Sequence, residues 1–138
     1  MLRADHRVVL LQHGGLADLL RLAPHVDGVN IKLLKSGGLA EALLMARTAR
    51  RLGLGVMLGC YSDGSLLNGA AAQLLPLVRW PDLDSHLNLV DDPFVGLERQ
   101  GEVLLPPAAP GIGVRPGPTL VAELAAGPGP QPGTGEVV

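Results

Sequence analysis

The stretch that decides the fold is residues 27–39, Asp27-Gly28-Val29-Asn30-Ile31-Lys32-Leu33-Leu34-Lys35-Ser36-Gly37-Gly38-Leu39. The apolar residues at Val29, Ile31 and Leu33-Leu34 predict a β-strand over residues 29–34, and the Gly37-Gly38 pair predicts a tight turn after it. From Leu39 to Leu52 apolar residues recur every three or four positions, which predicts an amphipathic helix. The stretch is therefore a strand–loop–helix unit.

The same order of elements surrounds this unit. The sequence predicts a short helix over residues 16–22 before it, and a strand over 55–60 and a helix over 65–78 after it. A further strand opens at Asp82, so the predicted strands start about 27 residues apart. Units of this length join parallel strands by right-handed crossovers, in either a barrel or an open doubly wound sheet. The predicted fold class is α/β.

Two polar side chains interrupt the predicted strand over residues 29–34. Strands buried on both faces of a parallel sheet are normally continuous runs of Val, Ile and Leu. Alternation places Asn30 and Lys32 on one face, and Ile31 and Leu33 on the face where the covering helix packs. An ammonium group facing the helix layer would collide with it. In a barrel, Lys32 instead points inward near the carboxyl-terminal mouth, where barrel enzymes hold their chemistry.

The stretch 82–89 alternates in the same way, with polar residues at Asp82, Asp84, His86 and Asn88. This pattern predicts a strand with one polar face. Two interpretations are open: an antiparallel or edge strand whose polar face meets solvent, or a barrel strand whose polar face lines the mouth.

Residues 27–39 resemble the sixth-strand signature of the mandelate racemase/muconate lactonizing branch of the enolase superfamily, and within it the dipeptide epimerases. Three further motifs follow in the family's order, covering the seventh strand, the eighth strand and the closing segment: Gly59-Cys60-Tyr61-Ser62, Asp82-Leu83-Asp84 and Pro110-Gly111-Ile112-Gly113-Val114. The resemblance covers about residues 16 to 115. It implies a partial (β/α)8 barrel of the TIM type, made of about the last three βα units.

The resemblance also implies which residues carry the chemistry. Lys32 matches the lysine base, and Asp82 and Asp84 match the pair that holds the substrate's α-ammonium group. In the family a divalent cation, usually Mg²⁺, binds the substrate carboxylate and stabilises the enediolate formed when the α-proton leaves. Ala4-Asp5-His6 resembles a remnant of the family's Ala-Asp-Glu, which makes Asp5 the candidate metal ligand.

Several parts of the family's site have no counterpart here. The second base lies in a Lys-x-Lys motif in the family, whereas the only lysines of this chain are Lys32 and Lys35. The other metal ligands and the capping domain are also unmatched. A TIM barrel needs eight βα units over roughly 250 residues, and this chain has 138. The sequence therefore predicts a truncated barrel.

Composition bounds the remaining possibilities. No apolar run approaches the roughly 20 residues that span a bilayer, and the N-terminus carries no export signal. Basic residues do not cluster beyond Arg50-Arg51 and aromatic residues make up only 2% of the chain, which disfavours a nucleic-acid partner. The single cysteine, Cys60, agrees with a cytoplasmic location.

The chain divides into two predicted parts. Residues 1–115 are expected to form the partial barrel domain, with a closing strand near Gly101–Leu105. Residues 116–138 are expected to form a disordered tail, because a sequence rich in Pro and Gly maintains neither a helix nor a strand ladder.

The resulting prediction is a fragment of a Mg²⁺-dependent dipeptide epimerase that is inactive alone and whose full-length form binds a dipeptide. One alternative is a non-catalytic remnant that associates with a partner, or with a second copy, through exposed strand edges. Another is a fragment of a muconate cycloisomerase or o-succinylbenzoate synthase, which share the lysine. The Asp82 and Asp84 pair argues against the latter, because those substrates carry no ammonium group.

Overall fold

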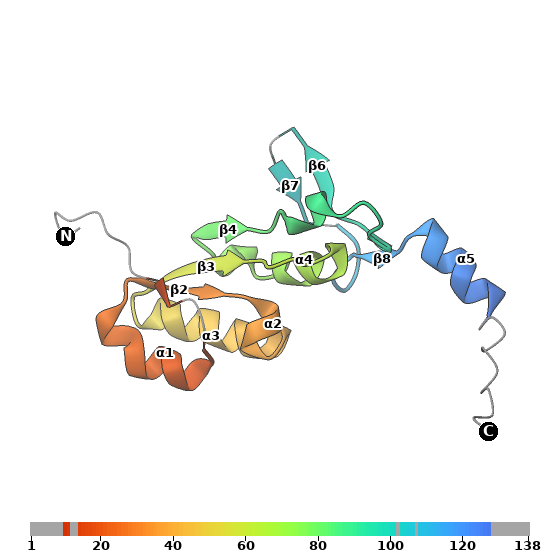
Figure 1. Ribbon diagram of the computed structural model, residues 1–138. Helices are drawn as coiled ribbons and strands as arrows, with labels where there is room; N and C mark the ends of the chain where they lie inside the picture. Colours follow the sequence, from red (N-terminus) through yellow and green to blue (C-terminus); the bar gives the residue numbers. More distant parts are fainter. Residues whose placement is uncertain (1–9, 12–13, 102, 107, 128–138) are drawn as a thin grey trace, which may run out of the picture.

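A parallel sheet of four strands forms the centre of the protein (Figure 1). The computed structural model describes residues 10–11, 14–101, 103–106 and 108–127. Each strand pairs in parallel with the next, in the order β1 (Leu10–Leu11), β2 (Gly28–Ile31), β3 (Gly55–Gly59) and β4 (Trp80–Asp82). The predicted α/β class with crossover connections is confirmed. The sheet is open and does not close into a barrel.

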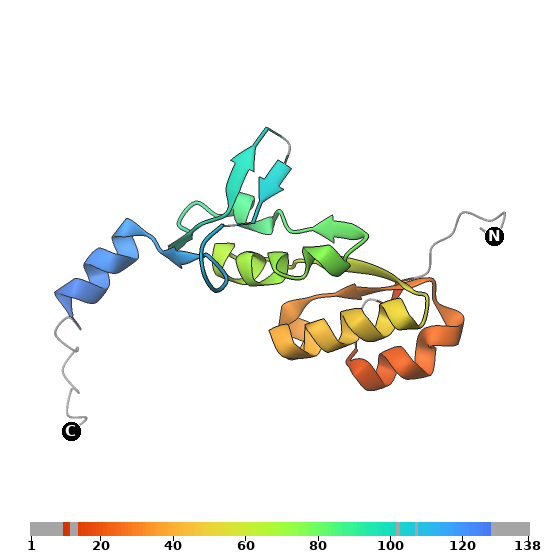
Figure 2. The ribbon, with the colours of Figure 1, turned by 180° about the vertical axis from the view of Figure 1, so that it is seen from behind.

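Helices cover one face of β2 and β3, as Figures 1 and 2 show from opposite sides. The longest helix, α3, packs against both strands, and α1 packs on the outer side of α3. The helical segments are α1 (Leu16–Leu22), η1 (Ala23–His25), α2 (Leu33–Ser36), α3 (Leu39–Arg51), α4 (Ser65–Ala72) and η2 (Leu75–Leu77). The helix predicted to run to residue 78 ends at Ala72, and Pro76, which has no N–H to donate, lies in the separate turn η2.

The hydrophobic core lies between the sheet and α3. Alternate strand residues point into it, and the residues that meet them on α3 are small or flexible, so helix and sheet approach closely. The side chains at its centre, each at most 1% exposed, are Leu19, Val29, Ile31, Ala42, Met45, Ala46, Ala49, Val56 and Leu58.

The strand that carries Lys32 is shorter than predicted. β2 ends at Ile31, and Lys32 is the N-cap residue of α2, not a residue in the middle of a strand. The Lys32 carbonyl accepts hydrogen bonds from the Lys35 and Ser36 amides, both at 2.9 Å, which turns the chain into a helix. Gly37 then ends α2 with φ +93°, a left-handed conformation that favours glycine. Lys32 therefore lies directly at the carboxyl end of the strand.

The region after β4 also differs from the prediction. β4 ends at Asp82, and residues 85–88 form a 3₁₀ turn, η3 (Ser85–Asn88), so the alternating stretch 82–89 is not a strand. The strand predicted near Gly101–Leu105 pairs with its neighbour as a hairpin and not with the main sheet. The remaining strands are β5 (Phe94–Val95), β6 (Glu98–Gln100), β7 (Val103–Leu105) and β8 (Arg115–Pro116); β5 pairs with β8 and β6 with β7, both antiparallel.

The expectation of a disordered tail from residue 116 is wrong for its first part. Helix α5 (Pro118–Ala126) lies within it, and its sequence is rich in Ala and Leu, with Pro118 at the first helical turn, where it is tolerated. Glycine and proline are absent from 119–126 and frequent again from Gly127 onward, and residues 128–138 lie outside the described residues. The domain boundary at 115 stays a prediction. Among the described residues, no helix is long and apolar enough to cross a membrane.

Candidate active site at the carboxyl edge of the sheet

The carboxyl ends of β2, β3 and β4 bring Lys32 and Asp82 to the same level of the sheet. Gly59 pairs in register with Asp82, and Ile31 pairs with Leu58, so Lys32 follows at the level of Gly59. Residues at one level of a parallel sheet point to the same face, and two strand spacings separate the outer pair by about 10 Å. Lys32 is half-buried and Asp82 is exposed.

The Asn30 side chain occupies the space that a side chain at Gly59 would take. A Cβ atom added to Gly59 would lie 2.6 Å from Oδ1 of Asn30, so this position has no room for a side chain. Asn30 is 7% exposed and lies one level below Lys32 on the same strand face. The Asn30 amide therefore lies against Gly59, on the sheet face that carries the Lys32 amine and the Asp82 carboxylate.

Asp84 lies close to Asp82 at the carboxyl edge of the sheet. The thiol of Cys60 lies 3.9 Å from Oδ1 of Asp84, and single ligand atoms of Cys60, Asp82 and Asp84 all lie within 4.8 Å of one another. Two exposed carboxylates at this separation repel each other, so a cation bound between them is favoured. A cavity of about 350 Å³ borders both aspartates and has mostly apolar walls from β4, η2 and the β6–β7 hairpin.

These residues do not make a good magnesium site. Mg²⁺ prefers six hard oxygen ligands in octahedral geometry, whereas the one three-residue cluster of this kind in the described part of the chain offers two carboxylates and a soft thiol. The predicted ligand Asp5 lies outside the described residues. Its role stays a prediction.

A buried polar network lies next to Asp84 in the sequence and includes Ser85 and His86. Ser85 donates to the Asp63 carbonyl at 2.9 Å and accepts from the Asn68 side chain at 3.1 Å, and Asn68 Nδ2 also lies 3.1 Å from Nδ1 of His86. All four residues are at most 8% exposed. The network ties the loop after β3 to η3, and η3 begins directly after Asp84. It therefore fixes where Asp84 leaves the sheet.

Sequence reasoning missed most of this network. The alternating stretch 82–89 included His86 among its polar residues, but no role was predicted for Asp63, Asn68 or Ser85. Asn68 carried a usable signal, because it is a lone amide in an otherwise apolar helix, and a buried amide needs partners.

Asp92 anchors the start of α4. Its carboxylate accepts hydrogen bonds from the Ser65 amide at 2.6 Å and from the Phe94 amide at 3.0 Å. Burial by itself raises the pKa of Asp92, but these hydrogen bonds, with one from the Ser65 hydroxyl, outweigh it, and the pKa lies below its ordinary value.

The lowered pKa of Asp92 predicts a pH-dependent contribution to stability. A carboxyl group whose pKa is lower in the folded state stabilises the fold above its unfolded pKa of about 4, and that contribution is lost as the pH falls through the folded pKa. We expect Asp92→Asn to lower the free energy of unfolding by about 1 kcal/mol at pH 7, and the difference from wild type to shrink below about pH 4.

Urea unfolding followed by circular dichroism at pH 7, 5 and 3 measures this effect. Asp91→Asn is the matched control, because it removes an exposed neighbouring carboxylate. A difference between Asp92→Asn and wild type that stays constant over this pH range would contradict the role of the charge.

Comparisons with known proteins extend the resemblance found in the sequence. No family model matches the chain. The chain is 50% identical over 91 residues to a hydrophobic dipeptide epimerase of Flavobacteria bacterium (strain MS024-2A), which covers 66% of this chain and 26% of the relative. It is 39% identical over 99 residues to the L-Ala-D/L-Glu epimerase of Bacteroides thetaiotaomicron, covering 72% of this chain and 26% of that protein.

Solved structures agree with the sequence relatives. The dipeptide epimerase of Methylococcus capsulatus, complexed with Mg and the dipeptide L-Arg-D-Lys, superposes with a TM-score of 0.74 at 30% identity, over 83% of this chain and 35% of that one. A substrate-liganded L-Ala-D/L-Glu epimerase from Bacillus subtilis gives 0.73 at 25% identity, over 80% and 33%.

This chain thus spans about a quarter of the curated relatives' length and about a third of these structures. The parallel sheet, the order of the motifs and the shared identity lead to one family. The chain belongs to the mandelate racemase/muconate lactonizing branch of the enolase superfamily and is similar there to the dipeptide epimerases.

Proposed function

We propose that this chain supplies part of a dipeptide-epimerase active site. In this proposal its sheet is the last three βα units of a (β/α)8 barrel, Lys32 exchanges the α-proton of the substrate, and Asp82 and Asp84 hold the substrate's ammonium group. The observation that carries the proposal is the row Lys32–Gly59–Asp82, in which an amine and a carboxylate lie at one level of the carboxyl edge of the sheet, on either side of a residue without a side chain.

The spacing of this row suits a dipeptide. Four backbone bonds join the amino nitrogen of a dipeptide to the α-carbon of its second residue, a distance of about 5 Å. The Cα atoms of Lys32 and Asp82 are about 10 Å apart, and the long lysine side chain spans much of the difference. An ammonium group held by Asp82 and Asp84 therefore places the second α-carbon within reach of the Lys32 amine.

The negative charges of Asp82 and Asp84 also suit the binding of an ammonium group. Two carboxylates neutralise an ammonium group through charge-assisted hydrogen bonds, which are stronger than bonds between neutral groups. The Asp82 and Asp84 pair also favours an epimerase over a cycloisomerase or synthase whose substrate lacks an amine.

The chain alone is expected not to turn over substrate. Epimerisation needs one group to remove the α-proton and a second group to return a proton from the opposite face. Lys32 can exchange a proton on one face of the substrate's α-carbon. The described residues offer neither a base for the opposite face nor a good magnesium site. The remaining units of a barrel must supply both.

A non-catalytic role remains a second candidate, because the sheet has free outer strands. β1 and β4 each pair with only one strand of the main sheet. A strand with an unpaired edge can pair with another chain. Concentration-dependent association of this chain, without any dipeptide binding, would favour this second candidate.

A chimera tests the proposed function. The matching segment of the Flavobacteria bacterium relative, 50% identical over 91 residues, is replaced by that of this chain. We expect the chimera to epimerise a hydrophobic dipeptide or L-Ala-L-Glu with Mg²⁺ present, and Asp84→Asn to weaken dipeptide binding by about 10- to 100-fold through loss of a charge-assisted bond.

Asp91→Asn controls for the loss of one exposed carboxylate, and the isolated chain controls for activity without the remaining units. A folded chimera whose dipeptide affinity is unchanged by Asp84→Asn would contradict the ammonium assignment. Turnover by the isolated chain would contradict the partial-site proposal.

A further inference from the structure

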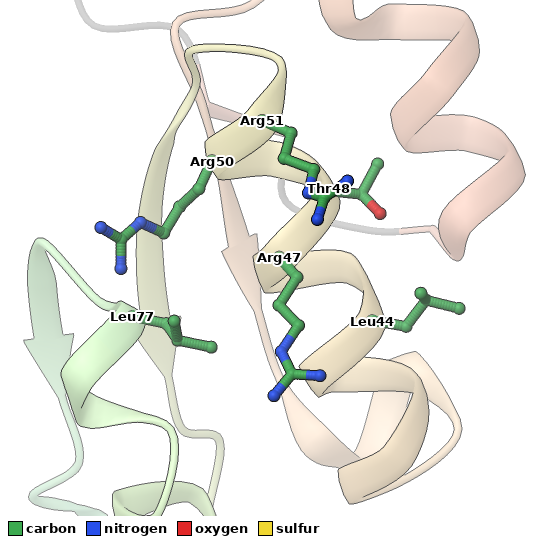
Figure 3. A pocket seen from close by; sticks show the side chains of 6 residues that line it. All are labelled: Leu44, Arg47, Thr48, Arg50, Arg51 and Leu77. Atoms are coloured by element: carbon green, nitrogen blue, oxygen red, sulfur yellow. The ribbon is translucent and has the colours of Figure 1, made fainter.

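A second pocket lies between α3 and η2, away from the candidate active site (Figure 3). It has a volume of about 470 Å³, within the range of small-molecule sites of about 300–1,000 Å³. We call it the arginine pocket; its lining residues are Leu44, Arg47, Thr48, Arg50, Arg51 and Leu77.

Three arginines line this pocket without carboxylate partners. Among the described residues, none of the three arginines forms an ion pair, and no acidic residue lines the pocket. Arg50 donates one hydrogen bond to the Pro76 carbonyl at 3.3 Å, which ties the end of α3 to η2. The chain as a whole carries a formal net charge of −2, so this positive charge is local.

Helix electrostatics accounts for only part of the cluster. Basic residues in the last turn of a helix interact favourably with its dipole, which explains Arg50 and Arg51. Arg47 lies one turn earlier and four residues before Arg51, a spacing at which like charges destabilise a helix by about 0.2–0.5 kcal/mol. A bound anion would relieve this repulsion.

The pocket also offers apolar walls. Figure 3 shows the Arg47 guanidinium between Leu44 of α3 and Leu77 of η2. Guanidinium groups bind phosphate oxygens through paired, planar hydrogen bonds. The Thr48 hydroxyl adds one neutral donor.

We propose that the arginine pocket binds a small molecule carrying a multiply charged phosphate group, with the rest of the ligand against Leu44 and Leu77. The three guanidinium groups match several negative charges better than the single charge of one carboxylate. The shared chemistry is the phosphate oxyanion, which a free phosphate and a phosphorylated metabolite both offer.

This site is independent of the proposed epimerase function. Arg50 and Arg51 lie at the end of α3, just before β3 begins at Gly55, whereas Lys32 and Asp82 lie where strands end. Because α3 runs antiparallel to the strands it connects, the pocket is at the opposite edge of the sheet from the candidate active site.

Calorimetric titration of the intact chain with inorganic pyrophosphate tests the proposal, at constant ionic strength with chloride as the background anion. We expect a Kd of about 1 mM or tighter. Arg47→Gln and Arg51→Gln are each expected to weaken binding about tenfold or more, and Arg115→Gln on β8, outside the pocket, to change it less than about twofold. Citrate, a carboxylate of comparable charge, is expected to bind at least about tenfold more weakly than pyrophosphate.

Each other outcome overturns the proposal. Absence of pyrophosphate binding excludes the site, and equal weakening by Arg115→Gln shows that binding follows net charge. Equal affinity for citrate excludes a phosphate preference. Circular dichroism checks the fold of each variant. If a glutamine variant does not fold, Arg47→Lys replaces it, because lysine keeps the charge but lacks the planar guanidinium group. Unchanged pyrophosphate binding by Arg47→Lys would contradict the paired contact.

Discussion

Lys32→Met is expected to lower epimerisation by the chimera about 10²- to 10⁴-fold, the range for loss of a positioned acid–base group. Methionine keeps a long unbranched side chain but has no amine to accept or return a proton. Lys32 lies at the carboxyl end of β2, and the position beside it on β3 is Gly59, so no side chain at this level replaces its amine. Chiral chromatography of the dipeptide product measures the rate.

Exchange of the α-proton in D₂O separates a catalytic from a structural effect of this variant. The unchanged part of the chimera is expected to carry the opposing base, so one epimer should still exchange its α-proton while the other loses exchange. Lys35→Met is the matched control, since Lys35 is an exposed lysine on the next helical turn, 5.4 Å from the centre of the Tyr61 ring. Equal loss of exchange from both epimers would contradict the role of Lys32.

Leu58→Ala is expected to lower the free energy of unfolding by about 2–5 kcal/mol. Leu58 is 0% exposed at the centre of β3 and belongs to the core between the sheet and α3. Its truncation removes buried carbon atoms and leaves a cavity that the close-packed sheet and helix cannot fill. Typical domains are stable by only about 5–15 kcal/mol, so this single change removes a large share of the total.

Urea unfolding followed by circular dichroism measures the loss. Leu124→Ala makes the same chemical change at a residue of α5 that is 68% exposed, and its effect should stay within about 0.5 kcal/mol. Equal midpoints for the two variants would mean that the buried cluster does not stabilise the fold as described.

The helices α1 and α3 were predictable from sequence, whereas the ends of the strands were not. α1 and α3 match their predicted spans to within one residue, because apolar residues repeat along them with the helical period. The run Leu33-Leu34 predicted more strand, yet Leu33 is 4% and Leu34 65% exposed in the short helix α2. A short apolar run fits a strand and a buried helical turn equally well, so local hydrogen bonds to the Lys32 carbonyl decided between them.

The candidate site also has a part that was predictable from sequence and a part that was not. Alternation predicted that Lys32 and Asp82 lie on polar strand faces, but the alternating pattern left the direction of the Asp82 strand open, and the parallel register of the structure brings the two residues to one edge. The buried polar network of Asp63, Asn68, Ser85 and His86 could not be predicted from sequence. The contact between Asn68 and Ser85 joins residues 17 apart that lie in a helix and a 3₁₀ turn, and no periodic pattern relates these two elements.

The parallel pairing of β2, β3 and β4 has a consequence for inheritance. The amine, the glycine and the carboxylate come from three successive strands, so one segment of the chain, residues 32–84, contains all three positions. A recombination event with both breakpoints outside that segment would move the three positions together and preserve their mutual spacing. Gene fusion or exchange within this family could therefore replace substrate-selecting regions around the segment without rebuilding the segment itself.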